Sequence, residues 1–185
     1  MLFLFAFIFG VVVGSFLNVC ISRIPNAQSL VLPPSHCPKC KAPISFYDNV
    51  PLLSYLVLRG RCRSCLQQIS SRYFFVELLM GLVAAALYYR FGLGFEFFVG
   101  FIFVGALLVI SFIDLDVRIV PDVISLPGII SGLAVSVIGY FFIGSQPSIV
   151  PSPVSSVVGI LVGGGFLLAT AWIYEKLTGV EGMGG

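Results

Sequence analysis

Long uncharged stretches dominate the pattern of hydrophobic and polar positions along the chain. Residues 1–22 contain no charged side chain, which is long enough for a helix to cross a hydrocarbon core of about 30 Å at about 1.5 Å per residue. This stretch lacks the basic start and the A-x-A site of a cleavable signal peptide, so we expect a spanning helix. Four further apolar segments follow, over residues 74–90, 96–113, 123–144 and 154–174. The pattern predicts an all-α integral membrane protein, a polytopic helix bundle with five spans.

The composition excludes a soluble globular protein. Of the 185 residues, 58% are hydrophobic and only 10% are charged, whereas soluble domains carry about 25% charged residues. The mean hydropathy of +1.08 agrees with this. A formal net charge of +2 is too small to indicate a nucleic-acid ligand. We therefore expect the lipid bilayer as a partner and no nucleic acid.

The positions of the basic residues predict the orientation of the chain in the membrane. The loop of residues 23–72 holds seven Lys or Arg side chains and one acidic residue, Asp48. Arg118 follows the third apolar segment and Lys176 follows the fifth. With five crossings, nine of the ten basic residues share one side and only Arg90 lies opposite. By the positive-inside rule we expect residues 23–72 in the cytoplasm and the N-terminus outside.

Small residues predict where helices pack closely. Gly10 and Gly14 have the small-xxx-small spacing that lets two helix backbones approach each other. The three glycines of residues 163–165 form a second smooth patch in the last apolar segment. We expect helix–helix contacts at both places.

Four cysteines in the long loop predict a metal site. Cys37 and Cys40 form one C-x2-C pair, Cys62 and Cys65 form another, and 21 residues separate the pairs. Two such pairs at this separation are typical of a tetrahedral, all-thiolate zinc site, which is structural because four sulfur ligands leave no open position. Two disulfides, or four unrelated thiols, are the alternatives, and the predicted cytoplasmic location disfavours disulfides. The sequence is thus divided into residues 1–22, a zinc-binding module of residues 23–72, and a polytopic region of residues 73–185.

Acidic residues cluster where the third apolar segment ends. Asp114 follows 17 uncharged residues, and Asp116 and Asp122 come soon after it. An ionisable residue within or at the end of a span is costly and indicates function. Two structural readings stay open: Asp114 pairs with Arg118 four residues later if the helix continues, and Asp122 starts the next helix. One carboxylate is not sufficient for aspartyl hydrolysis, which uses an ionised and a protonated carboxyl group together.

Several sequence motifs occur in a characteristic order. These are G-S-F-L-N-V-C-I-S-R-I-P at residues 14–25, Y-D-N-V-P at 47–51, S-Y at 54–55, L-R-G at 58–60, Arg72-Tyr73, Glu77, D-x-D-x4-P-D at 114–122 and E-G-M-G-G at 181–185. Together with the four-cysteine loop, they resemble the bacterial type IV prepilin peptidases. The last motif matches the start of that family's E-G-M-G-x-G-D pattern, and the resemblance covers nearly the whole chain.

The resemblance implies a membrane aspartyl endopeptidase of the G-x-G-D type in the bacterial inner membrane. Such an enzyme removes the leader of type IV prepilins and type II secretion pseudopilins at the cytoplasmic membrane face. Members with the four-cysteine loop often also methylate the new N-terminus with S-adenosylmethionine. Asp114 matches the first catalytic aspartate, while Asp116 and Asp122 match acidic positions near the site. The family pattern continues after Gly185 with the second aspartate and further helices, so we expect this sequence to be part of a longer enzyme.

A non-catalytic membrane scaffold is the alternative function. In that case the zinc module would dock a cytoplasmic partner, and no peptide bond would be cleaved. The two functions differ in what they require: a scaffold tolerates the loss of Asp114 but not of the four cysteines, whereas a peptidase depends on Asp114.

Overall fold

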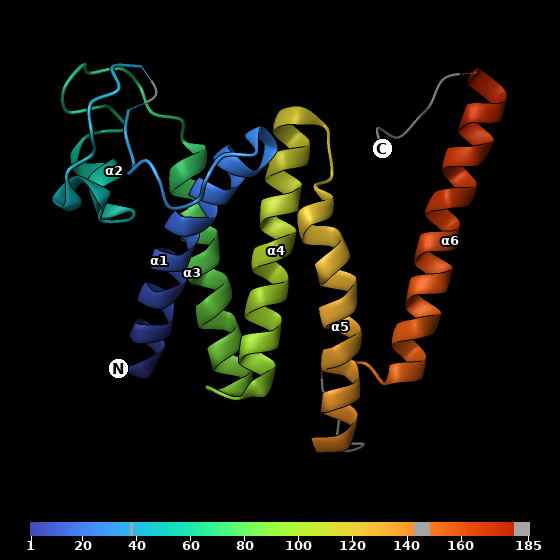
Figure 1. Ribbon diagram of the computed structural model, residues 1–185. Coiled ribbons are helices and arrows are strands. Elements are labelled where there is room, and N and C mark those ends of the chain that lie inside the picture. The colour runs from blue at the N-terminus through green and yellow to red at the C-terminus, as the bar shows by residue number, and fades with distance from the viewer. Residues whose placement is uncertain (38, 143–148, 180–185) are drawn as a thin grey trace. The chain divides into compact units, whose positions relative to one another are not determined.

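The computed structural model describes residues 1–37, 39–142 and 149–179, and Figure 1 shows the order of its elements. They are α1 (Leu2–Arg23), η1 (Ile24–Asn26), η2 (Phe46–Asn49), α2 (Leu53–Val57), α3 (Arg72–Phe91), α4 (Phe95–Val117), α5 (Asp122–Phe142) and α6 (Pro153–Thr178), where η marks a short 3-10 helix. Among the described residues there are isolated β-bridges but no β-strand.

The five long helices confirm the predicted all-α membrane fold. Each of α1, α3, α4, α5 and α6 is long and apolar enough to cross a membrane. The observed helices extend beyond the predicted apolar segments, because charged residues at a helix end lie at the membrane surface and do not interrupt the helix. The largest differences are at α4, which continues from residue 113 to Val117, and at α6, which continues from residue 174 to Thr178. Residues 143–144 of the predicted fourth segment lie outside the described residues.

The contacts divide the chain into two compact units, residues 1–113 and 114–185. In the first unit, glycines bring α1 and α3 into direct backbone contact. A Cβ atom added at Gly10 would lie 2.5 Å from the carbonyl oxygen of Met80, and one at Gly14 would lie 2.8 Å from Cα of Glu77. Gly81 of α3 makes the corresponding close approach to α1, since a Cβ atom added at Gly81 would lie 2.5 Å from Cγ2 of Val11. The predicted helix contact at Gly10 and Gly14 is confirmed.

Aromatic side chains attach the first part of α4 to this helix pair. Phe97 and Phe101 are buried together with Met80 and Ala84 of α3. The rings of Phe97 and Phe101 stack with their centroids 5.7 Å apart, and Phe9 of α1 lies 5.2 Å from Phe101. The apolar contacts of three helices thus form the core of the first unit.

The second unit contains the end of α4 together with α5 and α6. Ser136 of α5 is buried, donates a hydrogen bond to the carbonyl oxygen of Pro151 at 2.6 Å, and accepts one from the hydroxyl of Ser156 at 2.9 Å. These bonds join the two helices near the start of α6, where Ser152 caps the helix by accepting from the N–H of Ser155. Nothing lies within 4 Å of a Cβ added at residues 163–165, so the described structure shows no helix packed on that predicted patch.

Candidate metal centre and acidic site

Each cysteine pair lies in a tight turn of the same design. In the first turn, the N–H of Cys37 donates to the carbonyl oxygen of Ala42 and the N–H of Lys41 donates to the carbonyl oxygen of Cys37, both at 2.9 Å. In the second turn, Cys62 donates to Gln67 and Leu66 donates to Cys62, again at 2.9 Å. Lys41 and Leu66 occupy the left-handed region, with φ of +60° and +57°. The two turns are therefore equivalent at an offset of 25 residues.

The equivalence extends to two ten-residue hairpins, residues 35–44 and 60–69. Bridges join His36 to Pro43 and Arg61 to Gln68. Hydrogen bonds close the hairpins from Ile44 to Ser35 at 2.9 Å and from Ile69 to Gly60 at 2.7 Å. This internal repeat could not be recognised in the sequence, because the two segments share only the two cysteines and the final isoleucine.

The two turns bring all four sulfur atoms together. The Sγ atoms of Cys37 and Cys65 are 3.9 Å apart, as are those of Cys40 and Cys62. All four lie within 4.8 Å of one another. A tetrahedral metal ion with sulfur ligands at about 2.3 Å separates neighbouring sulfur atoms by about 3.8 Å, so the donor set fits such an ion. A disulfide requires about 2.05 Å, so the alternative of two disulfides is wrong in this structure.

Backbone N–H groups favour the thiolate form at the first cysteine of each turn. The N–H groups of Cys40 and Lys39 lower the pKa of Cys37 to about 6. Those of Cys65 and Ser64 lower the pKa of Cys62 in the same way. Metal ions bind thiolates and not thiols, so these backbone N–H groups favour the form of the two cysteines that binds a cation.

The pKa of Cys65 moves in the opposite direction. The N–H of Gln67 lowers it, but desolvation and the neighbouring cysteine sulfurs outweigh this effect and raise the pKa to about 11. Four thiolates at these distances repel one another, and a bound cation removes that repulsion.

An ion pair fixes the second turn to the rest of the module. Arg63, which follows Cys62, donates from Nε to one carboxylate oxygen of Asp48 at 2.7 Å and from Nη2 to the other at 2.6 Å. The hydrogen bonds of Arg63 hold the pKa of Asp48 below its usual range. The guanidinium also lies 5.6 Å from the ring centroid of Tyr47. Such a bidentate pair is geometrically specific, so it sets the position of η2 against the cysteine turn.

A buried carboxylate joins the module to the helices. Glu77 of α3 is 7% exposed, and its Oε2 accepts a hydrogen bond of 2.7 Å from the N–H of Leu52. Leu52 has φ of +60° and directly precedes α2. Close by, the side-chain amide of Asn18 in α1 donates to the carbonyl oxygen of Tyr73 in α3 at 3.0 Å. Glu77 belongs to one of the sequence motifs, but the sequence alone did not indicate this structural role.

Replacing Glu77 with Ala is expected to loosen the segment around Leu52. The partly buried N–H of Leu52 would lose its acceptor, which costs about 1–3 kcal/mol. Hydrogen exchange at the Leu52 amide should accelerate by roughly tenfold or more, whereas Glu77→Gln keeps an acceptor oxygen and should retain most of the protection. Equal exchange rates in the wild type and in Glu77→Ala would show that this hydrogen bond does not hold the segment.

The three predicted acidic residues lie at helix ends in the second unit. Asp114 and Asp116 are in the last turn of α4, Asp122 is the first residue of α5, and all three are exposed. Arg118 has φ of +56° and its N–H donates to the carbonyl oxygen of Asp114 at 2.8 Å, which ends the helix. No ion pair between Asp114 and Arg118 occurs in the described part of the chain. The E-G-M-G-G motif lies outside the described residues.

Two protein-family models match this chain. Residues 8–91 match the bacterial peptidase A24 N-terminal domain, and residues 101–185 match the type IV leader peptidase family. Three similar proteins are all called prepilin leader peptidase/N-methyltransferase. The Aeromonas hydrophila protein is 34% identical over 98% of this chain and 68% of its own length, and the Pseudomonas putida protein is 36% identical over 97% and 67%. The Myxococcus xanthus protein is 47% identical over 71% of this chain and 39% of its own length.

The chain thus spans at most about two thirds of the length of these relatives. No solved structure matches it.

Proposed function

Because the chain belongs to the type IV leader peptidase family, we propose that it acts as a membrane-embedded aspartic endopeptidase of the G-x-G-D type. Its substrates would be type IV prepilins and type II secretion pseudopilins, cut at the cytoplasmic membrane face. The match over 98% of the chain to a relative named for this activity carries the proposal. The relatives' name also supports a second activity, N-methylation of the new N-terminus. S-adenosylmethionine would supply the methyl group, and no residue of this chain is assigned to that donor.

Asp114 is the proposed catalytic carboxylate of this chain. It ends a spanning helix at the level where a substrate with a basic leader and an apolar helix would present its cleavage site. Its exposed side chain supports access to water and substrate, and no ion pair of Asp114 occurs in the described part of the chain. In its ionised form the carboxylate would take a proton from the attacking water. A second carboxyl group, which the family pattern supplies in its G-x-G-D motif, would polarise the peptide carbonyl.

Zinc is the metal we propose for the four cysteines. Its role is structural, because four thiolates complete the tetrahedron and leave no position for substrate or water. The ion would hold the two equivalent hairpins together. Only Cys37 and Gly60 are buried among the described residues of the module, and glycine has no side chain, so metal binding would supply a large part of the module's folding free energy.

The proposed location is the bacterial inner membrane, with the N-terminus outside and residues 23–72 in the cytoplasm. The distribution of Lys and Arg supports this orientation. A membrane-impermeant thiol reagent applied to intact cells should label Leu93→Cys, in the short connection between α3 and α4, and should not label Gln28→Cys. Both positions are exposed, and both should react once the membrane is permeabilised. The reverse pattern in intact cells would contradict the proposed orientation.

The experiment that tests the activity uses a version of the chain that continues through the second aspartate. Purified protein is incubated with a prepilin, with and without S-adenosylmethionine, and the products are weighed by mass spectrometry. We expect release of the leader in both samples and a product heavier by one methylene group only when the donor is present. A protein that binds its metal and prepilin but returns the substrate uncut would favour the scaffold.

A further inference from the structure

The short helix α2 presents an apolar face to the exterior of the cysteine module. Leu53, Leu56 and Val57 are 62%, 60% and 76% exposed. Their spacing of three and four residues places them on one side of the helix. The other side is held by the module, since the hydroxyl of Ser54 donates to the carbonyl oxygen of Tyr47 at 3.1 Å and that of Tyr55 to Ile69 at 3.4 Å. The outward orientation of the three apolar side chains is therefore fixed by specific contacts.

Basic side chains border this face. A hollow of about 380 Å³ is lined by Val57 at the end of α2, by Arg59 and Arg61, and by Leu66 of the second cysteine turn. Leu66 is itself 69% exposed, so the apolar surface continues across the hollow. Arg59 and Arg61 form no ion pair within the described residues. We call Leu53, Leu56, Val57, Leu66, Arg59 and Arg61 the α2 face.

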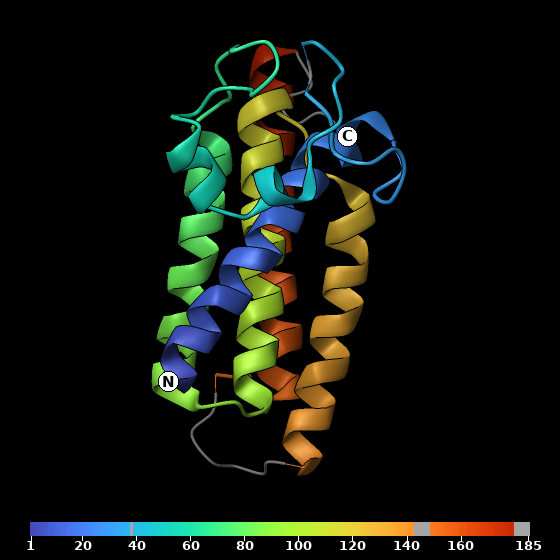
Figure 2. The same ribbon diagram turned by 90° about the vertical axis from the view of Figure 1, so that its left-hand side faces the viewer.

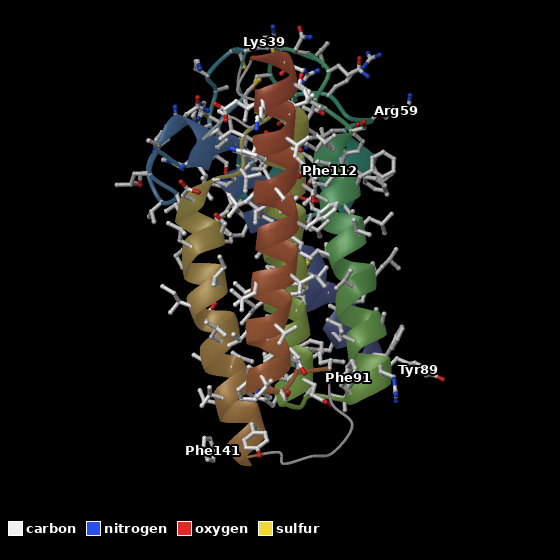
Figure 3. All side chains as sticks on the ribbon, turned by 90° about the vertical axis from the view of Figure 1, so that its right-hand side faces the viewer. Lys39, Arg59, Tyr89, Phe91, Phe112 and Phe141 are labelled. Atoms are coloured by element: carbon white, nitrogen blue, oxygen red, sulfur yellow. The ribbon has the colours of Figure 1, made fainter. Side chains whose placement is uncertain are left out.

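The α2 face lies where the spanning helices leave the module. Figures 1 and 2 both show α2 beside the upper end of α3. The hydrogen bond from Leu52 to Glu77 fixes the start of α2 to that part of α3. Figure 3 shows Lys39 at the top of the view and Arg59 lower, toward the upper end of α3, while Tyr89 and Phe91 lie at the opposite end of α3. Since α1 and α3 are long and apolar enough to cross a membrane, the α2 face lies at one end of a pair of spanning helices.

We propose that the α2 face docks on the surface of the bilayer that α1 and α3 cross, and that it binds anionic phospholipid headgroups there. Apolar side chains beside arginines are the chemistry of an interfacial membrane-binding segment. The leucine and valine side chains would enter the boundary between headgroups and acyl chains. Arg59 and Arg61 would donate to lipid phosphates, and each basic residue near such a surface strengthens the attraction. Because the helices tether the module, the lipid surface is always present at high effective concentration, unlike a soluble partner.

This docking would limit the movement of the module relative to the helices. In the described structure α2 is joined to α3 by the hydrogen bond from Leu52 to Glu77 and by the contact between the rings of Tyr55 and Phe74, whose centroids are 5.5 Å apart. An additional attachment through lipid would keep the module at a fixed height above the membrane. The inference depends on the membrane-spanning fold and not on the proposed peptidase activity.

The test uses tryptophan fluorescence in reconstituted vesicles. The printed sequence has one tryptophan, Trp172 in α6, so Trp172→Phe provides a background without one. A new tryptophan is placed on the α2 face by Val57→Trp, with Leu66→Trp as a second choice if the first fails to fold. Lys39→Trp places it in the first cysteine turn, which Figure 3 shows above Arg59. Each protein is reconstituted in phosphatidylcholine vesicles with or without phosphatidylglycerol, containing lipids brominated on their acyl chains as quenchers.

We expect strong lipid quenching at position 57 or 66 in vesicles with phosphatidylglycerol, less without it, and little at position 39. Arg59→Gln with Arg61→Gln should weaken docking by roughly thirtyfold and remove the dependence on phosphatidylglycerol. The matched control, Lys39→Gln with Lys41→Gln, removes the same charge and should leave quenching unchanged. Equal lipid quenching at position 39 and at position 57 or 66 would overturn the proposal, as would equal effects of the two double Gln variants. A tryptophan on the α2 face that neither brominated lipid nor aqueous iodide quenches would also overturn it, because it would indicate a protein partner.

Discussion

Asp114→Asn, in a version of the chain that completes the G-x-G-D motif, is expected to reduce kcat/KM for leader cleavage by roughly 10²–10⁴-fold or to the background rate. Asparagine keeps the size of the side chain but cannot accept the proton of the attacking water, and general acid–base catalysis contributes rate effects of this order. The substitution should leave the fold intact, since the Asp114 side chain is exposed and has no ion pair in the described part of the chain. Initial rates on a purified prepilin provide the measurement.

Asp116→Asn is the matched control for this prediction. It removes the same charge two residues later, about 200° around the helix, so its side chain points elsewhere. We expect this variant to keep most of the cleavage activity. Equal losses in the two variants would indicate that the acidic charge as a whole attracts the basic leader and that Asp114 has no special role. An unaffected Asp114→Asn enzyme would remove the catalytic assignment altogether.

Cys37→Ser is expected to unfold the cysteine module while the spanning helices still insert. Binding of a structural zinc ion contributes about 10–16 kcal/mol in small domains, and the loss of one thiolate breaks the tetrahedral set. Limited proteolysis should cleave residues 35–69 rapidly in this variant, and metal analysis should show a bound zinc fraction far below one ion per chain. A strong chelator added to the wild type should reproduce the proteolysis pattern.

Cys20→Ser separates the effect of the metal from that of losing any cysteine. Cys20 is buried in α1, away from the four-cysteine group. We expect this variant to keep its full metal content and its protease resistance in residues 35–69. Freshly prepared, reduced wild-type protein without bound metal would contradict the metal assignment, as would a Cys37→Ser variant that retains it.

The spans and the metal ligands could be predicted because each depends on a local pattern. Runs of uncharged residues indicate the spanning helices. Two C-x2-C pairs indicate a metal site even when the conformation of the loop between them is unknown. The end of α4 was placed too early, at residue 113, because hydropathy decreases at Asp114. Carboxylates at a membrane surface are compatible with a helix, so α4 continues until Arg118 adopts a left-handed conformation.

The contacts that position the module could not be predicted from one sequence. Asp48 and Arg63 are 15 residues apart, and Leu52 and Glu77 are 25 apart. No periodic pattern in the sequence relates residues at these separations, and only the folded loop brings them together. The two equivalent hairpins were missed for a related reason. Their likeness is in the backbone hydrogen bonds and in the left-handed φ of Lys41 and Leu66, while their side chains differ.

The most direct test of the proposed peptidase function is the size of prepilin recovered from bacteria in which a family-length version of this chain is the only leader peptidase. The wild type should yield prepilin shortened by its leader. Asp114→Asn, present in the membrane at the same level and with the same zinc content, should yield only the uncut form. Mature prepilin in the Asp114→Asn strain, or uncut prepilin in the wild-type strain despite a zinc-loaded, inserted protein, would contradict the account.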